Sequence, residues 1–78
     1  MSKEGRRVRI MFNYSKLKGR IKEVCQTQEI FSKKLGMSEA TLSARLNNKT
    51  EFTQSEIMNS QMILKFDKME IPLYFFTE

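Results

Sequence analysis

Two short amphipathic segments separated by a single glycine constrain this chain more than any other feature. Residues 28–47 read QEIFSKKLGMSEATLSARLN. Gly36 can adopt the positive φ that ends a helix at little cost, and the two lysines before it stand where a helix C-terminus favours cations. Ser38 can accept a hydrogen bond from an unpaired N–H in the first turn of a second helix. The segment is therefore predicted to form helices over residues 28–35 and 39–46, joined by a tight turn.

The two predicted helices share an apolar side and leave a polar one. Large apolar residues recur at intervals of four on each helix and one lies in the turn, so these side chains can close a common core. They are Phe31, Leu35, Met37, Leu42 and Leu46. The opposite side of the second helix carries small and polar residues, which let a backbone approach another surface closely. These are Glu39, Ala40, Ser43, Ala44 and Asn47.

Three further helices are predicted from the same kind of pattern. From Asn13 onward, apolar residues recur every three or four positions, at Tyr14, Leu17, Ile21 and Val24. Thr53 and Glu56 have the spacing of a capping box, so another helix begins near Gln54. Pro72 favours a short last helix in PLYFF, because it pre-sets a helical φ and removes an N–H that a helix start leaves unpaired. The expected fold class is therefore all-α, a compact five-helix domain without strands.

The C-terminal run from Leu73 to Phe76 has two alternative interpretations. Its large side chains are too many for a free tail. They either complete the core or form part of a dimer surface, and the two roles are compatible. With 78 residues the chain has room for one domain, so any dimer is expected to form through the helices themselves.

Charge is distributed unevenly along the chain. Residues 1–50 hold 12 Lys and Arg against 4 acids, a balance of +8, whereas residues 51–78 hold 2 against 5, a balance of −3. The basic half contains the two-helix unit. Such a field suits a polyanionic partner, with an ordinary solvated face as the alternative.

Several classes of function are made improbable by what the sequence lacks. Histidine, the usual general base and commonest metal ligand, is absent, and no constellation of acid, base and nucleophile is visible, so neither an enzyme nor a metal or cofactor site is expected. Cys25 is the only cysteine and is interpreted as a small apolar residue near a helix end. No apolar run approaches a membrane span or a secretory signal, so a cytoplasmic location is expected.

At this point the residues resemble a known family. TQEIFSKKLGMSEATLSARLNNKTEF, followed by an acidic-capped helix and IPLYFF, resembles the small phage Cro/repressor-type helix-turn-helix proteins of the lambda-repressor-like (XRE) class. The similarity spans roughly Tyr14 to Phe76. It includes Gln at the start of the first motif helix, the small Ser32 where the helices touch, Gly36 in the turn, and N-N-K where the family has N-G-K.

The resemblance implies a set of DNA-binding residues. Gln28 is placed against a phosphate, within reach of the second motif helix. The residues implied to face base edges are Glu39, Ala40, Thr41 and Ala44. Those implied to lie near the flanking backbone or groove walls are Ser38, Ser43, Arg45, Asn47 and Lys49.

Two positions depart from the family pattern. Arg45 stands where the family usually has an apolar core residue, and Leu46 takes that role one step later. Glu39 stands where many relatives have glutamine. Its carboxylate either accepts a hydrogen bond from a cytosine amine or simply stabilises the positive end of its helix.

Residues 1–12 are predicted to form a mobile basic arm ahead of a domain over 13–78. The arm carries Lys3, Arg6, Arg7 and Arg9. It either reaches phosphates or a minor groove or remains solvated, and its apolar residues Val8, Ile10, Met11 and Phe12 pack on the domain in a third interpretation. Met11 is a candidate alternative start.

The leading functional hypothesis is a sequence-specific, Cro-like phage repressor acting in a bacterial host. It would place residues 39–46 in the major groove of double-stranded operator DNA, near-palindromic if the protein is a homodimer. The alternative is a modulator or antirepressor that uses the same fold to bind a partner repressor. Glu39, the two alanines and the methionines expected on the surface motivate this alternative, because Met-rich surfaces adapt well to protein partners.

Overall fold

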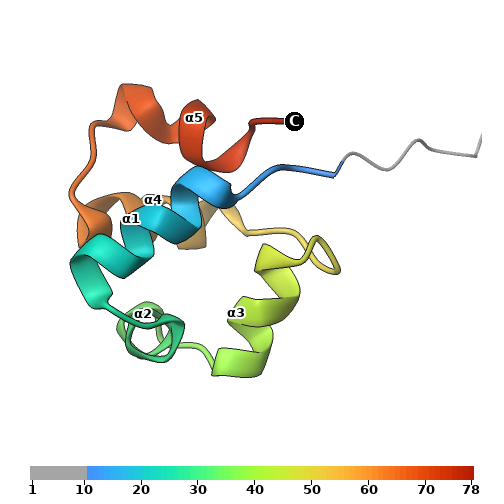
Figure 1. Cartoon of the computed structure of the whole chain (residues 1–78), viewed down its shortest axis with the longest axis vertical. Coiled ribbons are helices and arrows are strands. Elements are labelled where there is room, and N and C mark those ends of the chain that lie inside the picture. Colours follow the sequence, from blue (N-terminus) through green and yellow to red (C-terminus); the bar gives the residue numbers. More distant parts are fainter. Residues whose placement is uncertain (1–10) are drawn as a thin grey trace, which may run out of the picture.

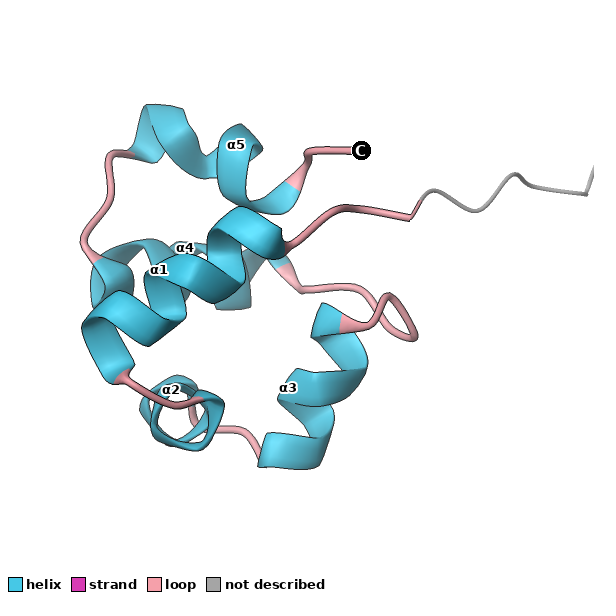
Figure 2. Ribbon diagram, viewed as in Figure 1, coloured by secondary structure: helices cyan, strands magenta, loops and turns pink. Residues whose placement is uncertain are grey.

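Five α-helices and one short 3-10 helix make up the ordered framework of the computed structural model, which describes residues 11–78. The helices are α1 (Ser15–Cys25), α2 (Gln28–Leu35), α3 (Glu39–Leu46), α4 (Gln54–Leu64), η1 (Lys68–Glu70) and α5 (Ile71–Phe75). No strand occurs within the described range (Figure 2). The predicted all-α, five-helix fold is therefore confirmed, and the predicted arm falls almost entirely outside the described residues.

The bounds of α2 and α3 agree with the sequence prediction because their caps form as expected. Gly36 ends α2 in the left-handed region with φ 78°. The Ser38 hydroxyl accepts the backbone N–H of Thr41 at 3.1 Å and so caps α3. Asn48, with φ 63°, turns the chain away after α3.

Side-chain caps also determine where the later elements α4 and η1 begin. Thr53 and Glu56 form the predicted capping box at the start of α4. A second capping box, between Asp67 and Glu70, starts η1, which the sequence analysis did not predict. Its signal was present, since an acidic residue three positions after an N-cap Asp has the same spacing as the box in α4.

Each α-helix contributes at least one fully buried apolar side chain to the core. Examples, each at most 1 % exposed, are Leu17, Phe31, Leu42, Leu64 and Phe75. Helix α1 lies at the centre of the arrangement, packed on α2, α4 and α5 (Figure 1). Cys25, at the end of α1, is buried in the same core, as its interpretation as a small apolar residue requires.

The C-terminal apolar run divides between core and surface. Tyr74 and Phe75 are buried, whereas Leu73 and Phe76 are about half exposed, at 51 % and 50 %. The Phe75 ring packs edge-on against Phe52 with centroids 5.1 Å apart. The core interpretation of this run therefore holds for its two middle residues.

Phe12 belongs to the domain rather than to the arm. Its backbone N–H donates to Asn48 Oδ1 and its carbonyl accepts from Asn48 Nδ2, both at 2.9 Å. Its ring lies edge-on to that of Phe76, with centroids 5.6 Å apart. Phe12 therefore packs on the domain, as the third interpretation of residues 1–12 expected for this residue, and the boundary at residues 12 and 13 stays a prediction.

Candidate functional site

Helix α3 lies along one side of the bundle and packs chiefly on α2 (Figure 1). Its inner side supplies Leu42 and Leu46 to the core, as predicted. On its outer side Glu39, Ala40 and Asn47 are exposed, and Thr41, Ser43 and Ala44 are half-buried. We call these six residues the outer face of α3. They are six of the ten residues that the sequence analysis placed at the DNA interface.

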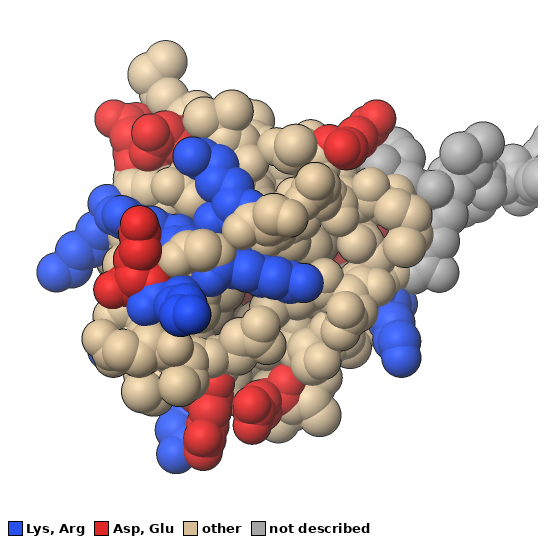
Figure 3. Space-filling view, viewed as in Figure 1, with Lys and Arg blue, Asp and Glu red and all other residues tan. Residues whose placement is uncertain are grey.

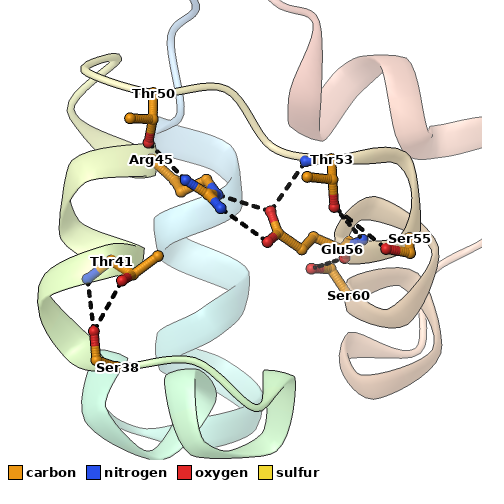
Figure 4. A network of polar contacts seen from close by, with 8 residues as sticks. All are labelled: Ser38, Thr41, Arg45, Thr50, Thr53, Ser55, Glu56 and Ser60. Atoms are coloured by element: carbon orange, nitrogen blue, oxygen red, sulfur yellow. Dashed lines mark hydrogen bonds and ion pairs between the residues drawn. The ribbon is translucent and has the colours of Figure 1, made fainter.

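Hydrogen bonds within the helix hold the polar groups of the outer face. The Ser38 hydroxyl donates to Thr41 Oγ1 at 2.9 Å (Figure 4). Asn47 Nδ2 donates to the Ser43 carbonyl at 2.8 Å and to the Ser43 hydroxyl at 3.2 Å. These hydrogen bonds restrict the polar side chains of the outer face, whose residues are mostly small.

Arg45 makes its contacts within the domain. Its Nε and one terminal nitrogen donate to the two carboxylate oxygens of Glu56, at 2.7 and 3.0 Å, and its other terminal nitrogen donates to Thr50 Oγ1 at 2.7 Å (Figure 4). The Arg45 and Glu56 side chains are only 17 % and 18 % exposed. Arg45 therefore joins α3 to α4, while the adjacent Leu46 fills the core position.

The pair is held in its charged form. Hydrogen bonding to Glu56 raises the pKa of Arg45, and hydrogen bonding to Arg45 lowers the pKa of Glu56 despite the opposing effect of burial. Glu56 also accepts the Thr53 N–H at 3.0 Å, which closes the capping box of α4. The guanidinium of Arg45 is therefore engaged in an ion pair within the domain.

The other predicted contacts are dispersed. Gln28, half-buried at the start of α2, lines a shallow hollow together with Lys18 and Lys22 of α1. Lys49 is exposed in the loop after α3, and Glu39 is exposed at its start. The outer face of α3 therefore carries one carboxylate and no cation of its own, whereas Lys and Arg gather over α1 (Figure 3).

The Arg45–Glu56–Thr50 network was not predicted from the sequence. An arginine on the leucine seam of α3 was visible, but its partner lies eleven positions later on another helix. Such a pairing depends on how α3 and α4 are placed in space, which periodicity does not predict.

Comparison with known proteins gives the chain a family. Residues 10–78 match the model of the family described as "Protein of unknown function (DUF739)". The chain belongs to this family. No curated protein matches this DUF739 chain.

A solved structure is similar to the DUF739 chain over most of its length. It is the solution structure of the modulator of repression of the temperate bacteriophage TP901-1 from Lactococcus lactis. The two chains are 40 % identical, with 83 % of this chain and 88 % of that chain covered and a TM-score of 0.74. Membership of the lambda-repressor-like class stays a prediction, since neither comparison names that class.

Two further kinds of feature are absent from the residues that the structure describes. No helix there is both long and apolar enough to span a bilayer. Within residues 11–78, no group of three or more Cys, Asp or Glu side chains is placed to hold a metal ion.

Proposed function

We propose that this DUF739 chain regulates repression by binding a repressor protein, with the outer face of α3 as the contact surface. The observation that carries the proposal is the 40 % identity, over 83 % of the chain, to a phage protein named as a modulator of repression. A partner repressor was the alternative hypothesis from the sequence, and the relative's name favours it over direct operator binding.

The composition of the outer face suits a protein partner. Protein interfaces are depleted of charge at their centre, and small side chains allow two backbones to approach closely. Ala40, Ser43 and Ala44 are small, and the neutral amide of Asn47 is held against Ser43. Glu39 stands at one end of the face and Lys49 beyond the other, as a charged rim would.

Direct operator binding is the second candidate function. The sharp α2–Gly36–α3 turn and the exposure of α3 favour it. Phosphate neutralisation by Lys and Arg, however, supplies much of the affinity of DNA-binding proteins. Arg45 is paired to Glu56, and the outer face has no cation of its own that could neutralise a phosphate.

A charge-adding variant separates the two functions. Ala40→Lys places a long cation on the outer face, so we expect repressor binding to weaken about tenfold or more, whereas an operator-binding helix would keep or gain affinity for DNA. The measurement is fluorescence anisotropy of the labelled chain titrated with the repressor purified from the same genome, and separately with its operator. Asn59→Lys, at an exposed position of α4, is the matched control.

Two outcomes would overturn the proposal. One is unchanged repressor binding by the Ala40→Lys chain. The other is a wild-type chain that ignores the repressor and prefers operator over random DNA by about a thousandfold, as sequence-specific DNA-binding proteins do.

A further inference from the structure

The outward side of α1 combines small residues with lysines on both flanks. In a helix, residues four apart lie on the same face. Ser15, Gly19 and Glu23 therefore share the outermost line of α1, with Lys18 and Lys22 along one flank and Lys16 on the other. Figure 3 shows Lys and Arg side chains gathered over this helix. We call this surface the lysine face of α1.

None of the three lysines is neutralised by a carboxylate of the described residues, and the ammonium of Lys16 lies over the ring of Tyr74, 5.1 Å from its centroid. Lys16, Lys18 and Lys22 are all exposed. Glu23, the acid on this helix, is paired with Arg20 at 3.2 Å.

Arg20 has a separate, structural role. Its guanidinium donates to the carbonyls of Leu64 and Lys65, at 2.9 and 3.1 Å, and so binds the end of α4 to α1. Arg20 is therefore not part of the lysine face, because its donors already bind groups of the domain.

Gly19 has no packing reason to be glycine. It is exposed in the middle of α1, and an added Cβ would meet no atom within 4 Å. Glycine at such a position destabilises a helix, so its absence of a side chain costs stability without relieving a clash. What glycine does provide here is room for another surface to approach the helix backbone closely.

We propose that the lysine face of α1 binds the phosphate backbone of nucleic acid without reading its sequence. Lys16 and Lys22 are six residues apart, about 9 Å along the helix axis, which spans two to three phosphates of one strand. The bare helix surface at Gly19 admits the backbone, and the lysines on either flank neutralise it. This surface is distinct from the outer face of α3 and does not depend on the repressor contact.

Salt dependence of binding to a short random-sequence duplex tests the proposal in the full chain. Replacing Lys16, Lys18 and Lys22 together with Gln removes about three phosphate contacts, so the slope of log affinity against log salt should become shallower by about 2–3. The wild type should accordingly lose about 40-fold more affinity than this variant between about 50 and 200 mM salt.

A charge-matched control uses Lys34, Lys49 and Lys68, which are exposed on other elements. Replacing these three with Gln lowers the net charge equally and should leave the slope within about 0.5 of the wild type. Equal flattening in both triple variants would attribute binding to net charge and overturn the proposal. A shallower slope in the control variant alone would also overturn the proposal, because it would place DNA on the surfaces that carry the control lysines.

Gly19→Gln tests close approach without changing charge. The helix should melt at a higher temperature, because glutamine favours helix, while duplex binding falls about tenfold. A more stable chain with unchanged affinity would remove Gly19 from the surface and contradict the close-approach model. Poly-glutamate and unlabelled duplex of equal charge can each be added as competitors for duplex binding. If poly-glutamate competes as effectively as the duplex, the face binds acidic polypeptides and the nucleic-acid assignment is overturned. No repressor is present in these assays, so their failure leaves the proposed function intact.

Discussion

Arg45 and Glu56 form a contact that fixes the position of α3 relative to α4. Each of the two carboxylate oxygens accepts one nitrogen donor of Arg45, and Thr50 engages a third donor. A bidentate pair of this kind restricts rotation as well as distance. The position of the outer face of α3 therefore depends on Arg45, which does not belong to that face.

Removing one partner of this pair should destabilise the fold. Arg45→Ala leaves the largely buried Glu56 carboxylate without its cation, and we expect the free energy of unfolding to fall by about 2–3 kcal/mol. Urea denaturation of the two single variants and of the double variant Arg45→Ala/Glu56→Ala measures the coupling. Strict additivity of the three changes would show that the pair contributes nothing as a pair.

The same pair predicts an acid-sensitive fold. The folded-state pKa of Glu56 is lowered from its ordinary 4.5, chiefly by hydrogen bonding to Arg45. Its stabilising contribution is therefore complete above the unfolded-state pKa and is lost as pH falls through the lower, folded-state pKa. Thermal melts from neutral pH downward should show a loss of stability below about pH 4.5 that is smaller in Glu56→Gln. Parallel melting curves for the two proteins would contradict this assignment.

At the level of the helices, local capping chemistry explains what the sequence could predict. The bounds of α2 and α3 depend on Gly36 and Ser38, and the start of α4 depends on Thr53, all of them contacts within one or two turns. The position of Arg45 and the attachment of Phe12 depend on partners in distant segments. Periodicity identifies exposed and small positions, but it does not identify the molecule that covers them. The assignment of α3 to DNA came from the family resemblance and stays a prediction.

Two glycines should respond to alanine in opposite directions. Gly36 has φ 78°, so Gly36→Ala should lower the free energy of unfolding by about 1–2 kcal/mol. Gly19 lies in regular helix with open space around it, so Gly19→Ala should raise it by about 0.5–1 kcal/mol. Denaturant titrations of both variants give the comparison. A stabilised Gly36→Ala chain would be incompatible with the left-handed turn between α2 and α3.

For the molecule as a whole, the two ends of the described chain meet beside the α3–α4 loop. Asn13 N–H donates to the Thr77 carbonyl at 2.6 Å, and Asn48 binds both backbone groups of Phe12. The family match begins at residue 10, close to this junction. Phe12 therefore packs on the domain, and the expected basic arm of Lys3, Arg6, Arg7 and Arg9 precedes it in the sequence.

Truncation locates the true start of the domain. A chain beginning at Met11 keeps every contact of Phe12, so its melting temperature should stay within about 2 °C of the full chain. A chain beginning at Asn13 loses the Asn48 hydrogen bonds and the Phe76 ring contact, and should melt about 4–8 °C lower for each kcal/mol lost. Equal melting temperatures for the two truncated chains would show that Phe12 does not stabilise the domain and belongs with the arm.

The surfaces of the molecule suggest a division of roles between a neutral outer face on α3 and a basic face on α1. Backbone amide NMR shifts of the full chain test this division most directly, with purified repressor and operator DNA added separately. Repressor should shift amides of Glu39 to Asn47, and DNA alone should leave that segment unmoved. Operator DNA that shifts those α3 amides, together with a repressor that does not, would contradict the assignment of α3 to a protein partner.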